Sequence, residues 1–146
     1  FLYYRLVQLQ RFNLYKRVMN KNKVLNIINK VYPLISKDYS CNAKIELHYN
    51  IYERLSGEKG MCGTACAQAE YDWSENKIYL YTSRLFNEED IIRSLIHECV
   101  HSNQNKEIFD AYYLCGKTYS NHPYEIEAKS AEKNWKKYKL NTISIG

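Results

Sequence analysis

The sequence predicts an α+β fold in which helices flank a small sheet. Apolar residues recur at helical spacing near both ends of the chain, over about 2–31 and 126–138. Between these segments, apolar and polar residues alternate as they do in a half-buried strand, with the apolar positions at Ile45, Leu47, Tyr49 and Ile51. A chain of 146 residues can bury a sufficient core on its own. We therefore expect one compact unit over residues 41–146, preceded by a basic helical segment over 1–40.

The basic segment is the first expected element. Its apolar residues repeat at helical spacing from Leu2 to Val31, and Pro33 is expected to end the helix because proline lacks an amide hydrogen. Residues 1–37 hold eight Lys or Arg and no acidic residue, so the net charge of +5 originates there. Three interpretations are open: a helix that packs on the core, a helix that contacts anionic lipid, or a helix that contacts nucleic acid.

A hairpin is expected after the first strand. Residues 65–71 and 77–82 have strand character and flank the turn at 72–76. With the first strand they would form a small, mostly antiparallel sheet. Residues 62–70 are the candidate edge at which an extended peptide could add as a further strand.

The run at 97–101 reads H-E-x-x-H and carries the strongest chemical signal in the chain. Asn87 is a suitable N-cap for a helix through this run. Residues four apart share a helix face, so His97 and His101 can direct their imidazoles to one metal ion. Imidazole nitrogens suit Zn²⁺, which takes three protein ligands in catalytic sites and leaves a position for water. Glu98 is then placed as the general base that takes a proton from the attacking water.

A third ligand is expected at the start of the next helix, which Pro123 marks. Glu125 falls in the first turn of that helix, and the small Ala128 on the same face allows close approach to the H-E-x-x-H helix. Glu127 lies about 200° around the helix from Glu125, so the two carboxylates do not share one ion easily. His122 remains the rival to Glu125, because a third histidine is equally good zinc chemistry.

The chain also resembles a known family in these motifs. The stretch YDWSENKIYL at 71–80, the H-E-x-x-H at 97–101, and the Asn, His and E-I-x-A within 121–128 together resemble the mitochondrial inner-membrane metallopeptidases that process and help assemble ATP synthase. The similarity covers about residues 60–130.

That resemblance implies a minimal zincin-like domain with one Zn²⁺ per chain. It implies that His97, His101 and Glu125 bind the zinc and that Glu98 is the catalytic carboxylate. It further implies a protein or peptide substrate, a larger membrane-associated assembly as partner, and a location at the mitochondrial inner membrane facing the intermembrane space.

Three functional hypotheses follow from the sequence. The first is a zinc-dependent metallopeptidase that hydrolyses peptide bonds with an activated water. The second is a non-proteolytic structural or assembly subunit that retains a zinc site. The third is a protease of protein–DNA crosslinks, which would favour His122 as a ligand and use the basic segment on DNA.

Overall fold

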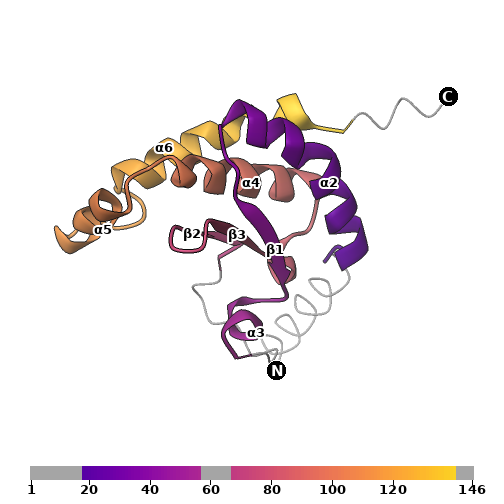
Figure 1. The fold of residues 1–146 in the computed structure, drawn as a ribbon, viewed down its shortest axis with the longest axis horizontal. Coiled ribbons are helices and arrows are strands. Elements are labelled where there is room, and N and C mark those ends of the chain that lie inside the picture. The colour runs from indigo at the N-terminus through magenta and orange to yellow at the C-terminus, as the bar shows by residue number, and fades with distance from the viewer. Residues whose placement is uncertain (1–17, 57–66, 141–146) are drawn as a thin grey trace, which may run out of the picture.

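The computed structural model describes residues 18–56 and 67–140, and it has the expected α+β class. The helices are α2 (Lys21–Asp38), α3 (Ile51–Ser56), α4 (Glu88–Ser102), α5 (Lys106–Leu114) and α6 (Pro123–Ala131). The strands are β1 (Lys44–His48), β2 (Ala69–Asp72) and β3 (Lys77–Tyr81), and the 3-10 helices are η1 (Thr82–Arg84) and η2 (Glu132–Tyr138). Figure 1 shows α5 and the start of α6 extending away from α2 and the sheet.

Helix α2 forms the described part of the basic segment. Asn20 caps it by accepting a hydrogen bond from the Lys23 amide at 2.8 Å. The expectation that Pro33 ends the helix is wrong, because the helix continues through it to Asp38. Pro33 lies on the exposed face, and the next turn buries Ile35 completely. Burial of that side chain, at about 1.5–3 kcal/mol, offsets much of the proline penalty of about 3 kcal/mol.

The sheet has the order β1-β3-β2. β2 pairs antiparallel with β3, which confirms the hairpin, and the Asp72 carboxylate accepts the Ser74 amide at 2.8 Å in its turn. β1 pairs parallel with β3, so the sheet is mixed rather than mostly antiparallel. The parallel pairing arises because α3 and β2 intervene between β1 and β3, and the chain therefore enters β3 in the direction of β1.

The first strand is shorter than the alternation at 45–51 suggested. It ends at His48, and Ile51 already begins α3. The side chain of Asn50 accepts the Glu53 amide at 3.0 Å, and this cap turns the chain into the helix. Residues 62–66 of the expected peptide-binding edge lie outside the described residues, whereas 67–70 run into the first half of β2, which is an outer strand among the three that the structure describes.

Helix α4 runs through the centre of the molecule. Asn87 caps it as expected, accepting the Asp90 amide at 2.8 Å. Its fully buried residues are Ile91, Ile92, Leu95, Ile96 and Cys99, which share one core with residues of α2 and the sheet. The helix that carries H-E-x-x-H is therefore the one that the core fixes most firmly. Within the described parts of the chain, no helix combines the length and apolarity needed to cross a bilayer.

Candidate metal centre

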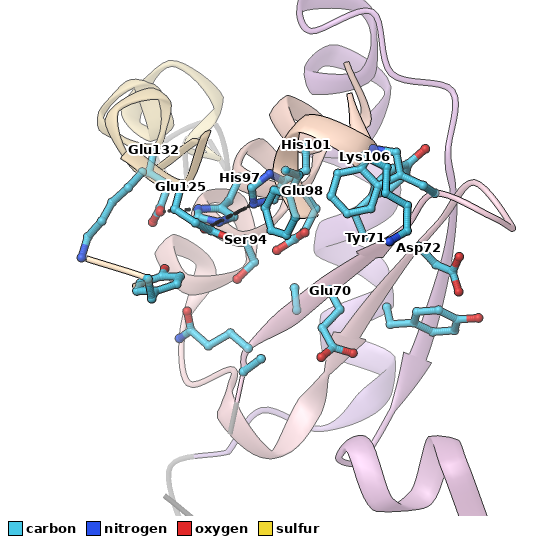
Figure 2. A pocket seen from close by; sticks show the side chains of 18 of the residues that line it. Glu70, Tyr71, Asp72, Ser94, His97, Glu98, His101, Lys106, Glu125 and Glu132 are labelled. Atoms are coloured by element: carbon cyan, nitrogen blue, oxygen red, sulfur yellow. Dashed lines mark hydrogen bonds and ion pairs between the residues drawn. The ribbon is translucent and has the colours of Figure 1, made fainter. Parts of the chain in front are cut away.

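The three expected ligands lie together between α4 and α6 (Figure 2). His97 and His101 occupy successive turns of α4, and their Nε2 atoms are 3.1 Å apart. Glu125, in the first turn of α6, places Oε2 3.0 Å from Nε2 of His97 and 3.4 Å from Nε2 of His101. All three residues are nearly or fully buried, and the buried Ala128 lets α6 approach α4 here.

The donor set fits a small divalent cation. Tetrahedral zinc with bonds of about 2.0–2.2 Å separates neighbouring donors by about 3.3–3.6 Å. The three separations found here, 3.0, 3.1 and 3.4 Å, lie close to those values. Two imidazole nitrogens and a carboxylate oxygen are also the donor types that such sites use. These residues can therefore hold a metal ion together.

The outer nitrogen of each imidazole has an acceptor of its own. His97 Nδ1 donates to Glu132 Oε2 at 2.9 Å, and His101 Nδ1 donates to Gln104 Oε1 at 2.6 Å. An oxygen acceptor at Nδ1 holds the proton there and leaves the Nε2 lone pair facing the centre. Three lone-pair atoms then converge within 3.4 Å, an arrangement that requires a proton or a cation among them.

The pKa values of His97 and Glu125 also indicate that the centre needs a positive charge. Burial disfavours the charged imidazole of His97, but its hydrogen bonds to Glu125 and Glu132 outweigh burial and raise its pKa to about 10. Burial also disfavours the carboxylate of Glu125, but hydrogen bonds from His101 and His97 lower its pKa to about 2. The centre thus favours an ionised Glu125 beside a positive charge. A protonated imidazole can provide that charge, and so can a metal ion bound by neutral imidazoles.

Glu98 faces the pocket beside the two histidines (Figure 2). It is buried, and burial raises its pKa to about 7. A carboxyl group with that pKa can both accept and release a proton near neutral pH, which a general base must do.

The alternative ligands lie elsewhere. His122 is fully buried, but its Nε2 donates to the Phe109 carbonyl at 2.9 Å and its Nδ1 accepts the Tyr124 amide at 3.1 Å. It therefore caps α6 and ties that helix to α5, with both nitrogens engaged. Glu127 accepts a hydrogen bond from Gln104 Nε2 at 3.2 Å and is exposed. The structure brings neither residue into the group formed by His97, His101 and Glu125.

The sequence did not predict that Glu132 and Gln104 belong to the centre. Glu132 lies seven positions after Glu125, so a helical continuation of α6 would have placed it on the same side. Gln104 lies three positions after His101, just past the end of α4. Its amide joins two elements, because Oε1 accepts from His101 and Nε2 donates to the Tyr124 carbonyl at 3.1 Å. Only the fold shows that these side chains meet the histidines.

A pocket of about 1060 Å³ opens in front of the centre. One of its walls is the segment from Ala67 to Trp73, which contains the edge strand β2. Glu70, Tyr71 and Asp72 of this strand line the pocket, and Figure 2 shows the carboxylates of Glu70 and Asp72 directed away from the histidines. An extended chain lying in the pocket would therefore run between the edge of the sheet and the metal-binding residues.

Comparison of the chain with models of protein families, with curated proteins and with solved structures gave no match.

Proposed function

We propose that this chain is a zinc-dependent metallopeptidase that hydrolyses peptide bonds with a water activated by Glu98. The observation that carries the proposal is the convergence of His97 Nε2, His101 Nε2 and Glu125 Oε2 at 3.0–3.4 Å, with Glu98 beside them in an open pocket. A structural zinc site has four protein ligands and is closed, whereas three ligands beside a pocket leave room for water and substrate.

Each residue has a distinct part in the proposed reaction. A zinc ion held by His97, His101 and Glu125 would supply Lewis acidity at the scissile carbonyl and lower the pKa of water. Glu98 takes the proton from the attacking water and delivers it to the departing amine. Glu132 and Gln104 hold the two imidazoles in the orientation and tautomer that binding requires.

The substrate is proposed to be a protein or peptide in extended form. Among the described strands, β2 has only β3 beside it and borders the pocket on its other side, so we propose that its main-chain groups on that side pair with a substrate strand. The resemblance seen in the sequence extends the proposal to an inner-membrane assembly of mitochondria that includes ATP synthase. The hypothesis of a protease of protein–DNA crosslinks gains no support, because it predicted His122 as a metal ligand. Both ring nitrogens of His122 are hydrogen-bonded instead, to Phe109 and Tyr124.

The first test is metal content together with peptide hydrolysis. The purified full chain should bind one Zn²⁺, and His97→Ala and His101→Ala should each abolish that binding, as measured by elemental analysis after dialysis. The zinc-loaded chain should cleave unfolded protein substrates, and the two variants should not. Full zinc retention in both variants would show that His97 and His101 do not bind the zinc. Tight zinc binding without cleavage of any substrate would favour the structural or assembly subunit instead.

A further inference from the structure

An aromatic wall borders the pocket on the side of α5. It consists of Trp73, which follows β2, and of Phe109 and Tyr113, which lie one turn apart on α5. The ring centroids of Trp73 and Phe109 are 5.1 Å apart, and those of Phe109 and Tyr113 are 5.3 Å apart. The three rings therefore form one continuous apolar surface.

The aromatic wall adjoins the metal centre directly. The ring of His101 lies 6.0 Å from that of Trp73 and 5.4 Å from that of Phe109. His101 also directs Nε2 at His97 and Glu125. A group bound at the centre is thus within one side-chain length of the wall. Lys106, whose ammonium lies 5.7 Å from the Trp73 ring centroid, marks this side of the pocket in Figure 2.

The wall is held in place by contacts other than the hydrophobic core. Trp73 Nε1 donates to the Gln104 carbonyl at 3.2 Å, and the ring of His122 lies 4.5 Å from the rings of both Phe109 and Tyr113. None of the three wall residues belongs to the core cluster, and α5 buries none of its residues fully. The fold therefore keeps three large rings partly exposed at the edge of a pocket.

We propose that the aromatic wall is a substrate subsite that accepts a bulky apolar side chain, and an aromatic one best of all, at a residue flanking the scissile bond. The proposal rests on the peptidase function above and names its substrate class. Aromatic rings attract one another edge-to-face at centroid distances of 4.5–7 Å, and the wall offers such faces next to His101. A polar side chain placed against the three rings would lose its water without gaining a partner from them, and the nearby ammonium of Lys106 is already paired with Asp110 at 2.8 Å.

Two hydroxamates test the subsite without requiring cleavage. Acetohydroxamate binds a zinc ion and carries only a methyl group, whereas 3-phenylpropionohydroxamate adds a phenyl ring that can reach the wall. The chain has two tryptophans, so Trp135→Phe leaves Trp73 as the sole reporter of binding by fluorescence. The phenyl compound should bind the zinc-loaded protein about 10–100-fold more tightly than acetohydroxamate.

Variants of α5 assign this preference to the wall. Tyr113→Ala should reduce the ratio of the two affinities by about 2- to 10-fold, and Phe109→Ala should reduce it similarly. Ile108→Ala is the matched control, because Ile108 is exposed on the same helix and is not among the residues lining the pocket. The ratio of the two hydroxamate affinities in Ile108→Ala should equal that in the parent protein. Equal affinities for the two hydroxamates, or a preference that survives Tyr113→Ala and Phe109→Ala, would overturn the subsite.

Matched peptides separate failure of the subsite from failure of the proposed function. The two peptides differ only in having Phe or Asp beside the cleaved bond, and the Phe peptide should have the higher kcat/KM. Tyr113→Ala should reduce this difference in kcat/KM. Cleavage of both with equal kcat/KM would overturn the subsite and leave the peptidase standing. A phenyl preference in hydroxamate binding with no cleavage of any peptide would support the subsite and contradict the peptidase.

Discussion

Glu98 differs from its neighbours in the centre because it faces the pocket without belonging to the group of three candidate metal donors. Replacing its carboxylate by an amide of the same shape removes proton transfer and leaves the metal donors intact. Glu98→Gln should therefore bind one zinc with unchanged thermal stability, while peptide hydrolysis falls by about 10²–10⁴-fold. Elemental analysis and the rate on one defined peptide measure the two effects. Zinc loss in Glu98→Gln would show that Glu98 supports metal binding rather than the reaction.

The third donor can be identified by comparing three alanine variants. Glu125→Ala removes a carboxylate within 3.4 Å of both histidine donors and should lower zinc affinity most strongly. His122→Ala removes the cap of α6 and should weaken zinc about 10–100-fold or less through the position of Glu125. Glu127→Ala loses one exposed contact to Gln104 and should leave zinc affinity nearly unchanged. Competition with a fluorescent chelator measures all three, and a stronger effect of His122→Ala than of Glu125→Ala would refute the assignment.

Glu132 provides a separate test of how the imidazole of His97 is held. Its carboxylate accepts the Nδ1 proton at 2.9 Å. Glu132→Gln keeps the length of the side chain but allows the amide nitrogen to face Nδ1, which weakens control of the tautomer. Zinc affinity should fall about 10–100-fold. Lys133→Gln is a suitable control because the neighbouring Lys133 is exposed, and it should bind zinc as the parent does.

Helix α2 shows at the scale of an element how tertiary burial overrides a local stop signal. Ile35 is fully buried and Leu34 is 56% exposed, although both lie within two residues of Pro33. Ile35→Ala should lower the free energy of unfolding by about 2–5 kcal/mol through the cavity it leaves. Leu34→Ala should change that free energy by less than about 0.5 kcal/mol. Urea denaturation measures both, and equal effects would mean that the helix does not continue beyond Pro33 as described.

Local sequence predicted those elements that local interactions determine. The capped helix α4, the hairpin of β2 and β3, and the helix beginning at Pro123 each follow from residues close together in the chain. The parallel partnership of β1 with β3 was missed because it joins Lys44 to Lys77 across two other elements. The spacing of the two histidines predicted that they could share a metal ion, and Glu125 was preferred over His122 from its place in the first turn of a helix and from the family resemblance. The contacts of Glu132 and Gln104 depend on packing that no short pattern encodes.

At the scale of the whole molecule, the candidate metal centre connects the core to the C-terminal elements. α4 supplies His97 and His101, α6 supplies Glu125, and η2 supplies Glu132. α4 is anchored by a large apolar core, whereas α6 buries only Glu125 and Ala128. Much of what holds α6 against α4 is therefore polar, and it converges on the place where a cation would lie.

Metal removal should therefore lower the stability of the protein as well as its activity. A ligand that binds only the folded state stabilises it by RT ln(1 + [L]/Kd), which is about 2.7 kcal/mol at a free concentration of 100 Kd. For a domain of this size, that corresponds to a rise in Tm of about 5–10 °C. Thermal unfolding with EDTA and with added zinc measures the shift. His101→Ala should unfold at the same temperature under both conditions, because it has lost the centre. A parent protein whose Tm does not respond to zinc would show that α6 is held without the ion, and that the polar contacts of Glu125 and Glu132 are sufficient by themselves.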